Sequence, residues 1–276
     1  MQITEKIQLL GAGLYKDIPG ELTLKTMPTA TELDYVGAED FDAIMLDSIL
    51  PQSVEEKVNF RNLLEIDYQW ICRCLRFLNY GYYHTTGTIY CDKCGQTSRG
   101  EYRVDLRSIA CKPLPPKFTN RLKVSKDEFL DFDQDIILHL PTIQEVINAS
   151  KDKAFQGSNG RTNREFARIC YSVSSIGAEN TLNPFEVRMR LQNNLSPADF
   201  MILRRRFTEL SDYGLRAGGE AECPNCHNKT AAFLALIDER YFRPTLDDLR
   251  EWKHDRNQRE DKNVSTTPAG NVPKHN

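Results

Sequence analysis

The sequence has no long apolar run and no excess of basic charge. No stretch approaches the roughly 18–20 apolar residues that a membrane-spanning helix needs, so we predict no membrane span. The first residues, 1–13, lack a basic segment followed by a long apolar one, so we expect no signal peptide. The net charge of −3 and the pI of about 6.0 count against bulk nucleic-acid binding, for which a basic footprint is typical.

The common motifs of catalysis and nucleotide binding are also missing. There is no GxxxxGK[ST], no GxGxxG after an expected strand, no HExxH and no GxSxG. None of the five histidines pairs with a nucleophile in an interpretable pattern, and the acidic segment 127–135 is interpreted as a solvated turn. We therefore predict that the protein is not an enzyme and has no small-molecule substrate.

Cysteine, in contrast, is plentiful. Eight cysteines would suit a disulfide framework in a small secreted protein, but the chain is 276 residues long and has no expected signal peptide. These observations favour a reducing compartment, and we predict a cytoplasmic protein.

Four of the cysteines form two CxxC pairs, Cys91/Cys94 and Cys223/Cys226. Two cysteines separated by two residues can turn both sulfurs onto one ion, and thiolates are the usual ligands of structural zinc. Gly95 relieves the tight turn of the first pair, and Pro224 suits the turn of the second. The pattern predicts one structural Zn²⁺ held by all four cysteines, with no coordination position left for water. Such a site would clamp distant parts of the chain together.

Other interpretations of the cysteines remain open. The pairs are also compatible with redox-active dithiols or with thiols that bind nothing. His227 is considered as a substitute ligand, but we prefer to interpret it as a surface neighbour, since four cysteines already satisfy the ion. The remaining cysteines lack partner spacing, and we expect packed thiols at Cys72, Cys74, Cys111 and Cys170.

The two CxxC pairs belong to a wider repeat. Cys91 lies 24 residues after Asp67, and Cys223 lies 24 residues after Asp199. Each aspartate precedes an aromatic residue in an expected helix, and a strand and the letters "MPT" or "LPT" come earlier in each half. We predict an α+β fold of two related strand–helix–zinc-knuckle halves, joined by the zinc-ribbon-like site. The halves are residues 1–115 and 116–250, and residues 251–276 are expected to be a disordered tail.

Helix signals are clearest in two places. Residues 54–81 have apolar positions at helical spacing and predict one or two helices. The second helix is predicted to begin at Ser196 as the N-cap and to end at Gly214 as the C′ residue.

Surface contacts are expected in two aromatic segments and in the tail. "RYFRP" (240–244) carries adjacent aromatics before a proline, and a turn near the first knuckle carries several tyrosines. The candidate partner-binding residues are Tyr80, Tyr82, Tyr83, Tyr241, Phe242 and Pro244.

These motifs together resemble a known family. The order "LYKDIPGELTLKTMPTATEL", "IDYQWICRCLRFLNYG", "CDKCG", "DIILHLPT", "CPNC" and "YFRP" is similar to that of the baseplate hub assembly proteins of T-even-type tailed bacteriophages. The resemblance implies a chaperone or scaffold that helps the baseplate hub of the phage tail to form. It implies tail hub proteins as partners and the cytoplasm of the infected host as the location, and leaves open whether the protein stays in the virion.

The alternative function is a zinc-ribbon nucleic-acid-binding or transcription-associated phage protein. It requires a local basic patch, for which the consecutive arginines Arg204–Arg206 are the candidate. The preferred interpretation of these arginines is a solvated or salt-bridged helix face.

Overall fold

The computed structural model describes residues 3–27, 40–81, 83–104, 106, 109–156, 162–180, 182–216 and 218–232. It has the predicted mixture of helices and strands. The strands are β1 (Thr4–Gln8), β2 (Glu21–Lys25), β3 (Tyr83–Tyr90), β4 (Thr97–Val104), β5 (Cys111–Lys112), β6 (Leu122–Val124), β7 (Ile136–Leu138), β8 (Val173–Ile176), β9 (Glu179–Asn180), β10 (Gly214–Leu215), β11 (Gly219–Glu222) and β12 (Lys229–Ala232).

The α-helices are α2 (Phe41–Ile44), α3 (Leu50–Ser53), α4 (Glu65–Tyr80), α5 (Ile143–Lys151), α6 (Arg164–Tyr171), α7 (Pro184–Asn194) and α8 (Pro197–Leu210). The shorter helical turns are η1 (Ala12–Leu14), the π-helical η2 (Met45–Ile49), η3 (Phe60–Asn62), η5 (Lys126–Glu128) and η6 (Lys153–Phe155).

The chain divides into two compact units, and each is made from separate segments. Unit 1 consists of Met1–Leu75 and Ala110–Arg216, and unit 2 consists of Arg76–Ile109 and Ala217–Asn276. The predicted halves 1–115 and 116–250 are therefore not the compact units, because each half contributes to both. The cause is strand pairing: the hairpin after α4 and the hairpin after β10 join one sheet. The predicted tail, 251–276, lies outside the described residues.

The first part of unit 1 is a two-stranded ribbon packed with short helices. β1 and β2 pair antiparallel, with Ile7 opposite Leu22. Leu22 and Leu24 are fully buried because they alternate onto the inner face of β2. Leu24 also forms an isolated bridge with Val54, which continues this ribbon beyond its two strands.

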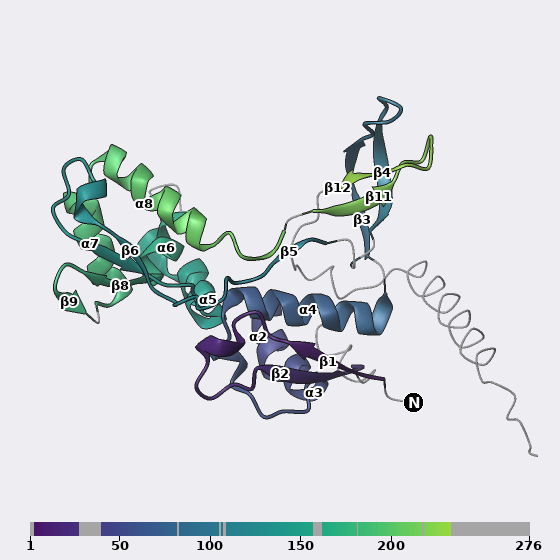
Figure 1. The fold of residues 1–276 in the computed structure, drawn as a ribbon, viewed down its shortest axis with the longest axis horizontal. Coiled ribbons are helices and arrows are strands. Elements are labelled where there is room, and N and C mark those ends of the chain that lie inside the picture. Colours follow the sequence, from purple (N-terminus) through teal and green to yellow (C-terminus); the bar gives the residue numbers. More distant parts are fainter. Residues whose placement is uncertain are drawn as a thin grey trace, which may run out of the picture. The chain divides into compact units, whose positions relative to one another are not determined.

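The second part of unit 1 is an antiparallel sheet of order β6-β7-β8-β9 (Figure 1). Helices α5 to α8 supply the rest of its apolar core. Ile136, Leu138 and Ile176 are at most 1% exposed in the sheet, as are Leu191 and Leu203 in the helices. This core fixes the loop between η5 and β7 through Phe129 and Phe132.

Two buried aspartates hold loops against helix starts in unit 1. Asp67, near the start of α4, accepts hydrogen bonds from the backbone N–H of Leu10 (2.6 Å) and of Gly11 (3.1 Å). Asp199, near the start of α8, accepts from the N–H of Leu130 (2.6 Å) and of Asp131 (3.2 Å). In both cases two consecutive loop N–H groups donate hydrogen bonds to the carboxylate of the third residue of a helix. These are the two aspartates of the predicted repeat.

Unit 2 is a four-stranded antiparallel sheet of order β12-β11-β4-β3. β3 and β4 form one hairpin over eight residue pairs, and β11 and β12 form the other over four. The hairpins meet where Ala221 pairs with Val104. In Figure 1 the blue and yellow-green strands show that this sheet joins segments distant in the sequence.

The helix predictions were partly right. Ser196 caps α8, since its hydroxyl accepts the N–H of Asp199. The helix ends at Leu210, however, and Gly214 is not its C′ residue but lies in β10, with φ +89. The glycine is required there by its left-handed backbone and by close packing, because a Cβ on Gly214 would lie 3.0 Å from Ile66. α4 begins only at Glu65, although the predicted helical stretch began at residue 54. Val54 bridges Leu24, and Leu64, directly before α4, bridges Thr142.

Candidate metal centre

The four predicted ligands come from the turns of the two hairpins in unit 2. Cys91 follows β3 and Cys94 lies in the turn before β4. Cys223 follows β11 and Cys226 lies in the turn before β12. Cys91 and Cys223 are buried, at 0% and 1% exposure. The site is therefore built within one sheet. It connects two hairpins of one unit, and these hairpins come one from each of the predicted halves 1–115 and 116–250.

The two turns have the same backbone geometry. In the first, the N–H of Gly95 donates to the carbonyl of Cys91 (2.8 Å), and the N–H of Cys91 donates to the carbonyl of Gln96 (3.0 Å). In the second, His227 donates to Cys223 (2.9 Å), and Cys223 donates to Asn228 (2.9 Å).

The residue after each second cysteine adopts a left-handed conformation. Gly95 has φ +67 and His227 has φ +57. Glycine adopts this region freely, whereas a residue with a Cβ adopts it at a cost. The two turns therefore share one shape, although only the first has the residue best suited to it.

The sulfur atoms lie at distances suited to one ion. The Sγ atoms of Cys91 and Cys226 are 3.6 Å apart, those of Cys94 and Cys223 are 3.8 Å apart, and all four lie within 4.8 Å of one another. A zinc ion with Zn–S bonds of about 2.3 Å has sulfurs about 3.8 Å apart at the corners of a tetrahedron. A disulfide requires about 2.0 Å, and all eight cysteines are free thiols. The four cysteines are thus positioned to bind a metal ion.

The thiols of the cluster differ in acidity. Hydrogen bonds from the Gln96 backbone and the Asn225 side chain lower the pKa of Cys94 to about 6. The Asn228 N–H acts to lower the pKa of Cys226, but burial and the neighbouring thiols raise it to about 11. One thiolate thus forms near neutral pH while a neighbour retains its proton. Metal binding must displace such protons, because thiolates are the ligands.

His227 is an exposed neighbour of the site, as preferred from the sequence. Its Nδ1 lies 2.6 Å from Oε1 of Glu222, and its side chain is 77% exposed. The four sulfurs already account for a tetrahedral ion. His227 therefore pairs with a carboxylate at the surface beside the site.

The other cysteines are packed, as predicted. Cys72, Cys74 and Cys170 are buried, and Cys111 is half-buried. Burial raises the pKa of Cys74 and of Cys170 to about 12. These thiols therefore stay protonated at neutral pH and do not compete for the metal.

The candidate partner surfaces are only partly described. Tyr80 is 4% exposed, and the guanidinium of Arg76 lies 4.7 Å from its ring centre. Tyr80 is therefore a packed residue and not available to a partner, which corrects its assignment. Tyr82, Tyr241, Phe242 and Pro244 lie outside the described residues, as does the side chain of Tyr83.

The consecutive arginines of α8 are all paired with carboxylates. Arg204 pairs with Glu165 (2.6 Å), Arg205 with Glu209 (3.1 Å), and Arg206 with Glu128 (3.0 Å) and with Glu209 (2.7 Å). This is the salt-bridged face that was the preferred interpretation of the three residues.

A hydrogen-bonded network around His139 was not predicted from the sequence. Its Nδ1 lies 2.9 Å from Oγ of Ser174, and its Nε2 lies 3.1 Å from Oε1 of Glu145. Glu145 also caps the start of α5. The network ties β8 to this helix, and no sequence spacing marks it because strand pairing brings His139 and Ser174 together.

Comparison of the sequence and structure with protein-family models, curated proteins and solved structures found no match. Among the described helices, none combines the length and the apolar character needed to cross a bilayer.

Proposed function

We propose that the four cysteines hold one structural Zn²⁺. The support is chemical: thiolates are soft ligands that favour zinc, and four of them complete a tetrahedron and leave no site for a reacting water. Protein purified without added metal is expected to contain about one zinc per chain by mass spectrometry of the metal. Cys94→Ser should lose most of it, whereas the matched Cys111→Ser should keep it. Equal zinc in the two variants would contradict the proposal.

The predicted duplication of a strand–helix–knuckle unit is proposed on two observations. The turns at residues 91–96 and 223–228 have matching hydrogen bonds, and Asp67 and Asp199 both hold pairs of loop N–H groups. If the knuckles are equivalent, the sequence "CDKCGQ" should replace "CPNCHN" at residues 223–228 with no loss of zinc. A hybrid that binds no zinc while still folding would argue against equivalence.

The proposed function is that of a non-enzymatic assembly factor, a chaperone or scaffold for the baseplate hub of a phage tail. It rests on the resemblance of the sequence motifs to that family. The proposed four-thiolate site would stabilise the fold and would leave no coordination position for a reacting water. The partners would be tail hub proteins in the cytoplasm of the infected host.

The test is genetic. A phage lacking this gene should form tails without complete baseplates, as seen by electron microscopy, and the wild-type gene supplied from a plasmid should restore them. Cys94→Ser should restore them poorly and Cys111→Ser fully. Normal baseplates in the absence of the gene would overturn the function and leave the zinc proposal untouched.

The nucleic-acid alternative has less support from the described surface. Its candidate arginines are compensated by Glu165, Glu209 and Glu128, so they offer little uncompensated charge to a phosphate backbone. A gel-shift experiment at 50 mM and 200 mM salt separates the two functions. Salt-sensitive binding that is lost in Arg204→Gln would favour the alternative.

A further inference from the structure

Three polar side chains from different elements of unit 1 form one hydrogen-bonded line. Oγ of Ser174, in β8, lies 2.9 Å from Nδ1 of His139, which follows β7. Nε2 of His139 lies 3.1 Å from Oε1 of Glu145, in α5. A hydroxyl, an imidazole and a carboxylate stand in this order in serine hydrolases, and such a set is identified by its geometry on whatever fold it occurs.

The carboxylate decides where the imidazole proton lies. Oε2 of Glu145 accepts hydrogen bonds from the N–H of Thr142 (2.7 Å) and from its hydroxyl (3.0 Å). Burial acts to raise the pKa of Glu145, but its bonds with His139 and Thr142 outweigh burial and lower the pKa. An ionised carboxylate only accepts, so Nε2 of the neutral imidazole carries the proton. Nδ1 then presents its lone pair to the Ser174 hydroxyl, which is the arrangement of a general base.

His139 is held in place by the backbone on both sides. Its own N–H donates to the carbonyl of Ser172 (2.8 Å). The next residue, Leu140, donates its N–H to Oδ1 of Asn120 (2.6 Å), and Nδ2 of Asn120 donates to the carbonyl of Leu140 (3.4 Å). The imidazole therefore needs little reorganisation before it accepts a proton.

A β-bulge gives Ser174 its position. Two consecutive residues of β7 pair with Ser175 and Val173 of β8, so Ser174 is the extra residue of the strand. Val173 and Ile176 both belong to the apolar core, although residues three apart face opposite sides of a regular strand. The bulge accounts for this difference, and bulges re-aim side chains in this way beside active sites.

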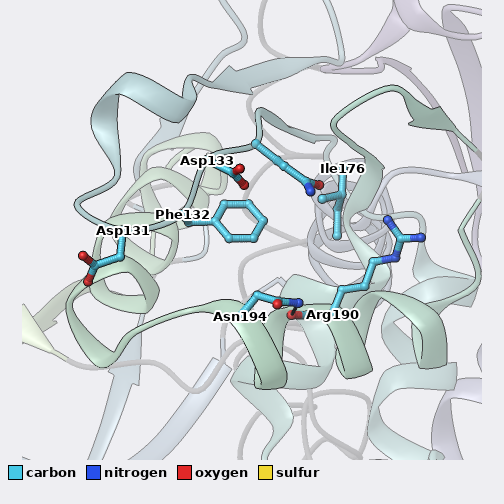
Figure 2. A pocket seen from close by; sticks show the side chains of 7 residues that line it. Asp131, Phe132, Asp133, Ile176, Arg190 and Asn194 are labelled. Atoms are coloured by element: carbon cyan, nitrogen blue, oxygen red, sulfur yellow. Dashed lines mark hydrogen bonds between the residues drawn. The ribbon is translucent and has the colours of Figure 1, made fainter.

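The network is open to solvent. Ser174 is half-buried, and the side chains of His139 and Glu145 are 19% and 30% exposed. Figure 2 shows a separate pocket at the other end of β8, where Ile176 lies across from Asp133. Ser174, His139 and Glu145 do not line that pocket. A small reagent can therefore reach the network from the surface.

We infer that Ser174 is the nucleophile of an esterase site for small carboxylic esters, with His139 as its general base and Glu145 as the residue that positions the imidazole. The substrate class follows from the partial exposure of the three side chains, which favours a small acyl group such as acetyl.

The reaction has two steps. Oγ of Ser174 attacks the carbonyl carbon of the ester, and its proton passes to Nδ1 of His139. The bond from this carbon to the alcohol oxygen breaks, and the alcohol leaves with the proton from Nδ1. Water then attacks the acyl carbon and gives a proton to Nδ1. The bond to Oγ breaks, the carboxylic acid leaves, and Oγ regains the proton.

This activity goes beyond the proposed assembly function, which needs no catalysis, and it does not rest on that function. It departs from the sequence-based prediction that the protein is not an enzyme. That prediction used local motifs, whereas strand pairing brings His139 and Ser174 together. Ser174→Ala should therefore abolish ester hydrolysis and leave the zinc content unchanged.

The first experiment treats the purified full-length protein with a fluorophosphonate, which phosphonylates serines that a base activates, and locates the adduct by peptide mass spectrometry. The adduct is expected on Ser174. His139→Ala should slow labelling at least about 100-fold, the usual contribution of a general base. The control Ser150→Ala removes an exposed serine of α5, whose hydroxyl donates to the carbonyl of Ile147, and should leave labelling within twofold.

Glu145→Gln distinguishes catalysis from a structural role. The two donors of Thr142 should attract the oxygen of the new amide, which turns its NH₂ towards Nε2 of His139. Nε2 then accepts, the proton moves to Nδ1, and the base faces Ser174 with no lone pair. Labelling should fall at least about 100-fold, while the circular dichroism spectrum stays that of the wild type.

The same proteins are then assayed for release of 4-nitrophenolate from 4-nitrophenyl acetate. Wild-type protein without an adduct on Ser174 would overturn the inference, and this result depends on the folding of no variant. Equal labelling of wild type and a folded Glu145→Gln would reduce the network to a structural one. Unchanged ester hydrolysis in Ser174→Ala would assign the activity to another residue.

Discussion

Gly95 offers a clean test of the backbone geometry of the metal knuckle. It has φ +67, and a Cβ added there would meet no heavy atom within 4 Å. Gly95→Ala therefore changes the backbone preference and creates no clash. The left-handed region costs a residue with a Cβ about 1–2 kcal/mol, and alanine recovers about 0.4–1 kcal/mol through its smaller unfolded-state entropy. We expect Gly95→Ala to destabilise unit 2 by about 1 kcal/mol.

The assay should report on the site itself. With Co²⁺ in place of zinc, the thiolate-to-cobalt absorption disappears as urea unfolds unit 2. For a urea dependence of about 1–3 kcal/mol per molar, a loss of 1 kcal/mol lowers the unfolding midpoint by about 0.3–1 M.

The second knuckle provides the matched control. His227 occupies the equivalent position with φ +57 and already bears the cost of a Cβ. His227→Ala removes only an exposed pair with Glu222 and should change stability by less than about 0.5 kcal/mol. A midpoint for Gly95→Ala at or above the wild-type value would refute the argument, as would equal losses in the two variants.

Three further predictions concern buried carboxylates and the thiols. Asp67→Ala leaves two backbone N–H groups and the Tyr15 hydroxyl without their acceptor, and should lower the free energy of unfolding by about 3 kcal/mol in thermal denaturation. Burial acts to raise the pKa of Asp199, but hydrogen bonds from loop N–H groups outweigh burial and lower the pKa. This carboxylate therefore stabilises the fold above about pH 4, and the stabilisation is lost as the pH falls through the folded-state pKa. In Asp199→Asn, the thermal unfolding midpoint should depend less on pH in the acid range. Zinc affinity, measured by chelator competition, should already fall with pH near neutrality because Cys226 must release its proton, and should fall more steeply below about pH 6 as Cys94 is also protonated. Cys111→Ser should show the same pH dependence as wild type.

The ligand set was predictable from sequence because its signal is local. Two CxxC spacings identified the four cysteines, and the repeated 24-residue offset paired them correctly. The cap at Ser196 was likewise predictable, since a capping hydroxyl needs only the next few residues.

The unit boundaries and the pocket were not predictable, because they depend on long-range pairing. Ala221 pairs with Val104 across more than a hundred residues, and this contact decides that the two hairpins form one sheet. Gly214 was predicted to end a helix because glycine is the usual C′ residue. Its actual constraint, the close approach to Ile66, leaves no pattern in the neighbouring sequence. Asp133 gained its place in a pocket only through the neighbouring helix α7, which follows it by some fifty residues.

The discontinuous build of unit 2 has a consequence for synthesis on the ribosome. Cys94 and Cys223 are 129 residues apart, so at about 5–20 residues per second the first thiol pair waits roughly 6–26 s for the second. During that interval unit 1 is also being translated, and its residues 110–216 must emerge between the two halves of the sheet. The nascent chain therefore exposes a two-sulfur hairpin open to oxidation or to the wrong metal, and it becomes resistant only once translation passes Cys226.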